Sequence, residues 1–283
     1  DHRDLHSFPT RRSSDLKASC TDRALTMIHL LDTEGLSALY AFITPSTLFA
    51  FDLDGTLAPI VENPDSALIE DGIRTRLSRL SDLSTTAVIT GRAKDDAGKR
   101  LGFSPSYIIG NHGHEGLPGR KDDLAESKGI INNWRERISN ALPADINDGI
   151  LFEVKNGSLS IHYRHASFPE KTRTSIINAA RTLMPAPRCV GGIFVVNLLL
   201  PGSPGKGEAL LHLMKHAGAY KAFFIGDDET DEDVFRLDTP SIFSVCVGTQ
   251  RPTSARYYIS EQRFIGKLLD ELLNIIGQPE RKR

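Results

Sequence analysis

Short apolar runs that end in polar residues recur along this chain, and they limit the possible folds more than any other feature. The runs Leu48–Phe51, Thr86–Ile89 and Tyr107–Gly110 are separated by stretches with a helical spacing of apolar residues. A continuous apolar run of this length is typical of a strand buried on both faces of a sheet. Strands that alternate with helices form βαβ units, so we expect an α/β protein built on a parallel sheet.

The rhythm changes between residues 117 and 201. There the sequence indicates a helix, two strands, a second helix and two more strands, an order that favours antiparallel hairpins packed under two helices. Afterwards the alternation of strands and helices returns, with apolar runs at Ala222–Ile225 and Ile242–Val247. The middle segment is therefore predicted to be an α+β domain inserted into the first.

Composition excludes several classes of protein. The chain has 34 Lys plus Arg against 36 Asp plus Glu, which gives no overall field for nucleic acid or an anionic membrane. No apolar run approaches the ~18 residues of a membrane span. The three scattered cysteines, Cys20, Cys189 and Cys246, fit neither a disulfide framework nor a metal cluster. We therefore expect a cytoplasmic protein with no nucleic-acid or membrane partner.

The N-terminal residues carry no structural pattern. Residues 1–20 show neither helical nor strand periodicity, and we identify no secretory signal in them. The first methionine is Met27. We expect residues 1–26 to be either a non-native or mis-assigned extension or a disordered native tail, the two alternatives that composition leaves open.

Two acidic loops follow predicted strands. In Asp52-Leu53-Asp54-Gly55-Thr56 the carboxylates stand two residues apart, so along an extended chain both can face one pocket. Gly226-Asp227-Asp228-Glu229-Thr230-Asp231 follows another strand. Like charges held this close need a cation, and clustered oxygen ligands suit Mg²⁺. We infer one Mg²⁺ between the two loops.

Thr90 and Lys206 add the parts of a phosphate site. Thr90 has a hydroxyl and is followed by a glycine that frees backbone N–H groups, while Lys206 stands at a helix start, where N–H dipoles favour an anion. Each motif alone has a plainer interpretation, such as a threonine that ends a strand, an exposed lysine or an Asp231 that begins a helix. The four motifs in order, each at the end of a strand or the start of a helix, favour the phosphate site.

These four motifs resemble those of the haloacid-dehalogenase-like phosphotransferases, and the resemblance covers Leu48 to about Ile276. Within that superfamily the chain resembles the trehalose-6-phosphate phosphatases. Six segments carry the closer resemblance: Thr90-Gly91-Arg92, Asn111-His112-Gly113-x-Glu115, Glu153-Val154-Lys155, His162-Tyr163-Arg164, Lys206-Gly207 and Gly226-Asp227-Asp228-x-Thr230-Asp231-Glu232. One stretch departs from the family, whose members commonly carry an acidic and then a basic residue just before the proline that matches Pro201. This chain has Leu198-Leu199-Leu200 there.

The resemblance implies a Rossmann-like parallel sheet core with an inserted α+β cap domain. The expected division is an N-terminal extension at 1–45, disordered in its first part, core segments at 46–116 and 202–277, a cap at 117–201 and a C-terminal tail at 278–283. Ligand sites in such sheets lie outside the carboxyl ends of the strands, where all the motifs fall. The cap is then expected to close over that edge.

The same resemblance implies a Mg²⁺-dependent phosphatase that passes the phosphoryl group of trehalose 6-phosphate to Asp52 and then hydrolyses the aspartyl-phosphate, as the last step of trehalose biosynthesis. Asp54 would give a proton to the leaving sugar and take one from water. Thr90 and Lys206 would neutralise charge on the phosphoryl oxygens. The metal candidates are Asp52, Asp54 through its carbonyl, Asp227, Asp228, and Asp231, the last as a residue that orients the metal's waters or Lys206.

Eight further residues are candidate sugar ligands. Four of them lie at neighbouring strand ends of the core: Arg92, Asn111, His112 and Glu115. The other four lie in the cap: Glu153, Lys155, His162 and Arg164. A turn role for His112 and a solvent-facing strand pair for the cap residues are the plainer alternatives.

Two other functions stay open at this point. One is a related capped phosphatase for sucrose phosphate or a glycosyl-glycerate phosphate, which only the cap would distinguish. The other is a non-catalytic sugar-phosphate sensor, which the intact pair of Asp52 and Asp54 argues against. We expect a monomer whose partner is a small-molecule sugar phosphate, and the family suggests functional coupling to a trehalose-phosphate synthase.

Overall fold

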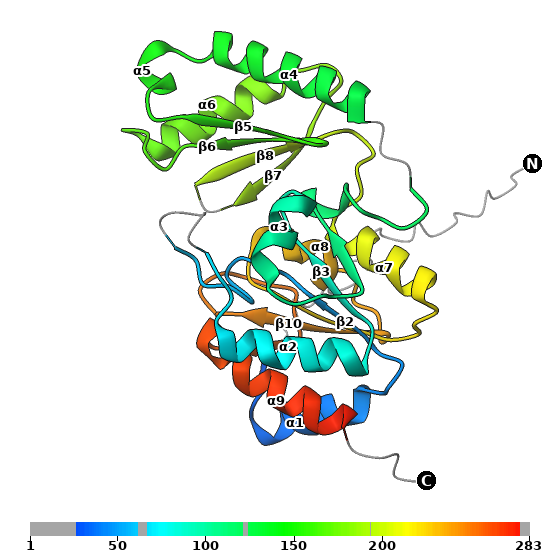
Figure 1. Ribbon diagram of the computed structural model, residues 1–283. Coiled ribbons are helices and arrows are strands. Elements are labelled where there is room, and N and C mark those ends of the chain that lie inside the picture. The colour runs from blue at the N-terminus through cyan, green and yellow to red at the C-terminus, as the bar shows by residue number, and fades with distance from the viewer. Residues whose placement is uncertain (1–26, 62–66, 121–123, 193, 278–283) are drawn as a thin grey trace, which may run out of the picture.

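The computed structural model describes residues 27–61, 67–120, 124–192 and 194–277, and it contains two separate sheets (Figure 1). The larger sheet has the strands β1 (Ile28–His29), β2 (Leu48–Phe51), β3 (Thr86–Ile89), β4 (Tyr107–Ile109), β9 (Ala222–Gly226), β10 (Ile242–Val247) and β11 (Tyr257–Ile259). They are parallel and follow the order β1-β11-β10-β9-β2-β3-β4. Their carboxyl ends therefore meet at one edge.

Helices cover both faces of the parallel sheet. They are α1 (Thr33–Phe42), α2 (Asp71–Leu83), α3 (Lys94–Leu101), α7 (Lys206–Ala217), α8 (Glu232–Phe235) and α9 (Ile265–Ile276), with the short turns η2 (Asn111–Gly113), η3 (Glu229–Asp231) and η4 (Gln262–Phe264). Phe49 and Phe51 point into the cluster under α1, α2 and α9, while Leu48 and Ala50 point into the cluster under α7. Burial on both faces explains why the strand sequences are apolar without interruption.

The smaller sheet belongs to the inserted segment. Its strands are β5 (Leu151–Lys155), β6 (Ser158–His162), β7 (Arg188–Gly192) and β8 (Val195–Leu199), antiparallel in the order β5-β6-β8-β7. The helices α4 (Leu124–Ala141) and α6 (Pro169–Ala180) cover one face through a cluster around Trp134, and the short α5 (Ala144–Asn147) follows α4. Figure 1 shows these helices on the side of the sheet away from the core. A parallel core with an antiparallel α+β cap confirms the predicted fold class.

The core begins earlier in the sequence than we expected. The strand β1 pairs with β11, and Leu30 and Leu39 are fully buried in the cluster under α1, α2 and α9, although residues 1–45 were predicted to be an extension. A strand of two residues has too little periodicity to be found in a sequence.

The expectations for residues 1–26 and 278–283 lie outside the described residues. In the described part of the chain, none of the helices has the length and apolar character that a membrane span needs.

Candidate active site

A buried ion cluster joins three elements at the carboxyl edge of the parallel sheet. Lys206 Nζ, from the first residue of α7, donates to Asp52 Oδ1 at 2.7 Å and to Asp231 Oδ1 at 2.8 Å. Asp52 follows β2 and Asp231 lies in η3 after β9. The three side chains are at most 6% exposed. The structure thus brings together the predicted nucleophile, the predicted phosphate-binding lysine and an acid of the second loop.

The two acidic loops fit closely against each other. Gly55 has φ +86°, and a Cβ at this position would overlap the carboxylate of Asp227. Thr56 Oγ1 donates to Asp227 Oδ1 at 3.2 Å. The backbone N–H groups of Asp227 and Asp228 donate to Asp231 Oδ2, each at 2.9 Å. Glycine is therefore required where the first loop meets the second, because this φ is strained for other residues and a side chain has no room.

Three carboxylates of this site could hold a divalent cation. Asp52, Asp227 and Asp231 each offer an oxygen within 4.8 Å of the others. Burial and the charges of the neighbouring acids raise the pKa of Asp227 to about 8. Burial also raises the pKa of Asp52 well above its usual value, against the charge of Lys206. Three acids around a single ammonium group have an excess of negative charge, and a cation bound by their oxygens would neutralise it.

Two predicted metal residues direct their carboxylates elsewhere. Asp228 Oδ1 accepts hydrogen bonds from the backbone N–H and the hydroxyl of Thr230, at 2.8 and 2.6 Å, and so caps η3. Asp54 accepts from Arg92 Nε at 2.7 Å and from Arg92 Nη2 at 2.6 Å. Neither carboxylate joins Asp52 in the described acidic cluster.

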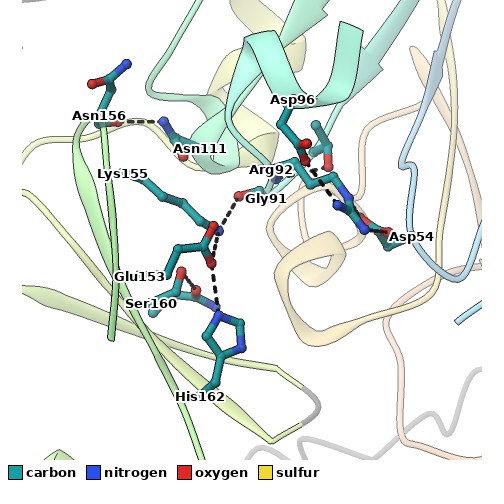
Figure 2. Close-up of polar contacts among 12 residues, drawn as sticks. Asp54, Gly91, Arg92, Asp96, Asn111, Glu153, Lys155, Asn156, Ser160 and His162 are labelled. Carbon is teal, nitrogen blue, oxygen red and sulfur yellow. Dashed lines mark hydrogen bonds and ion pairs between the residues drawn. The ribbon is translucent and has the colours of Figure 1, made fainter. Parts of the chain in front are cut away.

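Arg92, a predicted sugar ligand, binds protein groups on both sides. Figure 2 shows Arg92 between Asp54 and Asp96. Arg92 Nη1 donates to Asp96 Oδ2 at 3.0 Å. Its backbone N–H donates to the hydroxyl of Thr90 at 3.2 Å. Two parallel bonds between a guanidinium and a carboxylate fix both groups in orientation. In this structure Arg92 therefore orients Asp54, and Thr90 is buried at the end of β3.

The loop after β4 contacts the cap. Asn111 and His112 have φ values of +48° and +58°, which are uncommon for residues other than glycine and occur often at functional sites. Asn111 Nδ2 donates to the carbonyl of Asn156 at 2.6 Å and to Glu115 Oε2 at 2.9 Å. Asn156 Nδ2 donates to Glu115 Oε1 at 3.3 Å. Both Asn111 and Glu115 thus bind the turn between β5 and β6, and Figure 2 shows the contact of Asn111 with Asn156.

His112 is buried between the positive charges of the core and the cap. Burial, and then the charges of Lys206 and Lys155, lower its pKa to about 3. Its Nδ1 has no hydrogen-bond partner among the described residues. The imidazole is therefore neutral at physiological pH and can accept or donate a hydrogen bond without adding charge.

The cap residues form a second polar network on the sheet face opposite to α4 and α6. Glu153 Oε2 lies 2.9 Å from His162 Nε2 and 3.3 Å from Lys155 Nζ (Figure 2). These two partners lower the pKa of Glu153 to about 2, although burial acts in the opposite direction. Lys155 Nζ also donates to the carbonyl of Gly91 at 3.3 Å, so the network reaches the core. Arg164 lies beyond the end of β6 and stacks over Phe194, outside this network.

The leucines that depart from the family pattern divide between the two faces of the cap sheet. Leu198 and Leu200 belong to the cluster under α4 and α6. Leu199 and Asn197 alternate to the opposite face, where Asn197 Oδ1 accepts from Ser160 Oγ at 2.7 Å. Asn197 is thus a polar residue on the site-facing side that sequence reasoning missed. The alternation of apolar residues along β8 would have placed it there.

Comparison with known proteins agrees with this geometry. Residues 50–262 match the family model described as Trehalose-phosphatase. A trehalose-phosphate phosphatase of Mycobacterium avium is 31% identical over an alignment of 195 residues, and the match covers 65% of this chain and 49% of that protein. A bifunctional trehalose-6-phosphate synthase/phosphatase of Thermoproteus tenax is 29% identical over an alignment of 263 residues, and the match covers 89% of this chain and 35% of that protein. This chain therefore spans about half the length of the first relative and about a third of the second.

One solved structure extends the similarity to the fold. The trehalose-6-phosphate phosphatase of Aspergillus fumigatus, in its third crystal form, is 26% identical with a TM-score of 0.60. The match covers 87% of this chain and 99% of that chain. Both the parallel core and the inserted cap therefore take part in the likeness.

Proposed function

The chain belongs to the trehalose-phosphatase family, and we propose that it hydrolyses trehalose 6-phosphate to trehalose and phosphate. The observation that carries the proposal is the buried pair of Asp52 and Lys206 within an acidic cluster at the carboxyl edge of the sheet. The ammonium group of Lys206 favours the ionised, nucleophilic form of Asp52 against the effect of burial, and a bound cation would favour that form further. The cap network supplies directional partners for sugar hydroxyl groups.

In the first step, an Asp52 oxygen attacks phosphorus, the bond from phosphorus to the sugar oxygen breaks, and an aspartyl-phosphate forms. Lys206 and the Thr90 hydroxyl stabilise the charge on the phosphoryl oxygens. Asp54 protonates the departing sugar oxygen, which is a poor leaving group as an alkoxide. In the second step Asp54 takes a proton from water, the water attacks phosphorus, and Asp52 and phosphate are released.

Mg²⁺ is the proposed cofactor, held by Asp52, Asp227 and Asp231. Their oxygens match the hard ligands that Mg²⁺ prefers, and their raised pKa values support a cation at this position. When bound, the ion would supply positive charge for the phosphoryl oxygens. The resemblance suggested Asp228 and the Asp54 carbonyl as further ligands, and Asp228 would act here by fixing η3.

The acid/base role of Asp54 requires its release from Arg92. In this structure the guanidinium occupies both carboxylate oxygens, so Asp54 has to turn toward the substrate before it can transfer a proton. In this proposal Arg92 holds Asp54 in a resting orientation, which Asp54 leaves when it transfers the proton. Asn111, His112, Glu115, Glu153, Lys155, His162 and Arg164 remain the proposed sugar ligands.

The bifunctional relative in Thermoproteus tenax supports the proposed coupling to a synthase. The name of that protein describes both a synthase and a phosphatase, and this chain matches about a third of its length. We propose that the phosphatase described here acts on the product of such a synthase.

A phosphate-release assay tests the proposal. The substrates are trehalose 6-phosphate, sucrose 6-phosphate, glucose 6-phosphate and p-nitrophenyl phosphate, each with Mg²⁺ and with EDTA. We expect the highest kcat/KM for trehalose 6-phosphate and no turnover in EDTA. A preference for sucrose 6-phosphate would favour the related capped phosphatase, and no phosphate release from any compound would favour the sensor.

A further inference from the structure

We infer that Arg188, a cap residue that the sequence did not single out, binds the sugar part of the substrate. This inference rests on the proposed hydrolysis of a sugar phosphate. Arg188 is the first residue of β7, and across the sheet it pairs with Leu199, Leu199 with Ser158, and Ser158 with Lys155. Residues paired in this way point to the same face. Arg188 therefore shares the face that carries the proposed sugar ligand Lys155.

Arg188 has hydrogen-bond donors that no group in the described ranges uses. Its Nη1 donates to Asp233 Oδ2 of α8 at 3.2 Å. Its Nε and Nη2 are buried and have no hydrogen-bond partner among the residues that the structure describes. Leaving a buried donor of a charged group unsatisfied is costly, and such groups in proteins usually have a partner. Two of them on one guanidinium mark a site for an external acceptor.

The guanidinium lies where the cap meets the core, next to the catalytic cluster. A Cβ on Gly205, the residue before Lys206, would lie 3.2 Å from Arg188 Nη1. Asp52, where the phosphoryl group would bind, already has Lys206 as its cationic partner. In the proposed site, Lys206 together with the cation held by the three acids would compensate the charge of the phosphoryl group within the core. The donors of Arg188 remain for hydroxyl oxygens of the sugar, between the cap face and the start of α7.

The ion pair with Asp233 does not by itself account for this arrangement. The two side chains are 37% and 31% exposed, and ion pairs that water can reach contribute little to stability. The contact also uses only one of the three guanidinium nitrogens. Asp233 is better explained as the group that orients Arg188. A carboxylate bonded to Nη1 fixes the plane of the guanidinium and so directs its other donors.

Four variants separate these roles. Arg188→Ala removes all donors of the side chain. Arg188→Lys keeps the charge but removes the planar guanidinium. Asp233→Asn breaks the ion pair and leaves the guanidinium in place. Arg181→Ala is the matched control, because Arg181 is an exposed arginine of the cap whose side chain hydrogen-bonds only Asn178 among the described contacts. Each variant is assayed on p-nitrophenyl phosphate and on the sugar phosphate that the wild type hydrolyses best, and Tm is measured for each.

We expect Arg188→Ala to lower kcat/KM for the sugar phosphate about 10-fold to 100-fold, mainly through KM, with p-nitrophenyl phosphate changed less than about 2-fold. Arg188→Lys should lower kcat/KM for the sugar phosphate by most of the same factor. If the alanine variant does not fold, the lysine variant tests the inference. Asp233→Asn should have a smaller effect and Arg181→Ala none. Equal losses on both substrates, or no loss with either Arg188 variant, would overturn the inference.

The same assay keeps this inference apart from the proposed function. If the wild type prefers sucrose 6-phosphate or glucose 6-phosphate, the trehalose assignment fails and the Arg188 variants are judged on the preferred substrate. If the wild type hydrolyses none of the sugar phosphates, both the function and the role of Arg188 are wrong.

Discussion

The proposed catalytic cluster of the core and the polar face of the cap both consist of charged side chains, but they differ in how far those side chains are buried. In the core, Asp52, Lys206 and Asp231 are almost fully buried, and Lys206 Nζ lies within 2.8 Å of an oxygen of each acid. On the cap, Glu153 and His162 keep 46% and 35% of their side-chain surface exposed. The core groups are thus preorganised, as charge stabilisation in a transition state requires. The cap groups retain bonding capacity for a ligand.

This difference implies a division of labour between the two regions. Substitutions in the core cluster should damage hydrolysis of every phosphate ester, because each ester uses the same phosphoryl chemistry. Substitutions on the cap face should damage only those substrates that reach the cap. The comparison of a sugar phosphate with p-nitrophenyl phosphate therefore tests the division directly.

The largest expected effect is that of Asp52→Asn. The amide is not a nucleophile, so activity on trehalose 6-phosphate and p-nitrophenyl phosphate should both fall by roughly four to six orders of magnitude. Steady-state kinetics on both substrates, with circular dichroism as the check on folding, would measure this. Residual activity above about one part in a hundred on either substrate would show that Asp52 is not the nucleophile.

Asp54→Asn should have a smaller effect that depends on the leaving group. The amide cannot donate the proton, so kcat for trehalose 6-phosphate should fall about 10²-fold to 10⁴-fold with KM nearly unchanged. The loss should be smaller for p-nitrophenyl phosphate, whose leaving group needs no proton. A normal kcat with a raised KM would instead make Asp54 a binding residue.

The sequence was sufficient for the parts of the site that follow long buried strands. Asp52 and Asp227 stand directly after β2 and β9, and an apolar run that ends in acids is visible without any structure. The partner of Asp54 was not visible, because Arg92 reaches it across 38 residues from another strand end. The contact of Asn111 with the backbone of Asn156 was equally hidden. Such contacts depend on how the cap and the loops pack, and no local pattern encodes that.

Substitutions in the cap network should have a moderate and selective effect. Glu153→Ala leaves Lys155 and His162 without their shared carboxylate, and Lys155→Ala removes the contact with Gly91. Each should lower kcat/KM for trehalose 6-phosphate by about 1–3 kcal/mol in free-energy terms, or roughly 5-fold to 150-fold. Turnover of p-nitrophenyl phosphate should stay within about 2-fold.

The control for the cap variants is Glu170→Ala, at the exposed start of α6 on the other side of the cap sheet. It removes the same charge as Glu153→Ala and should leave both substrates unaffected. If Glu153→Ala impairs all substrates equally, the cap face takes part in the chemistry, and the division between the two regions fails.

The smallest expected effect is on stability, and it concerns His112, which lies between the two regions. Its pKa of about 3 in the folded protein is below the ordinary value of 6.5, so unfolding takes up a proton at mildly acid pH. The stability that comes from the neutral imidazole is complete above about pH 6.5 and is lost as pH falls toward 3. At pH 5 the loss is about 2 kcal/mol, from 1.5 pH units at ~1.36 kcal/mol each.

His112→Asn should remove this pH dependence, and asparagine tolerates the positive φ of the position. Urea denaturation at pH 7 and at pH 5 measures the free energy of unfolding of each protein at both pH values. The decrease in this free energy from pH 7 to pH 5 should be about 2 kcal/mol smaller in the variant than in the wild type. His165→Asn, in an exposed part of the cap, is the control. An unchanged difference in His112→Asn would mean that the imidazole does not stay neutral between Lys206 and Lys155. The charges of Lys206 and Lys155 would then lie farther from the imidazole, or be better screened, than in the structure.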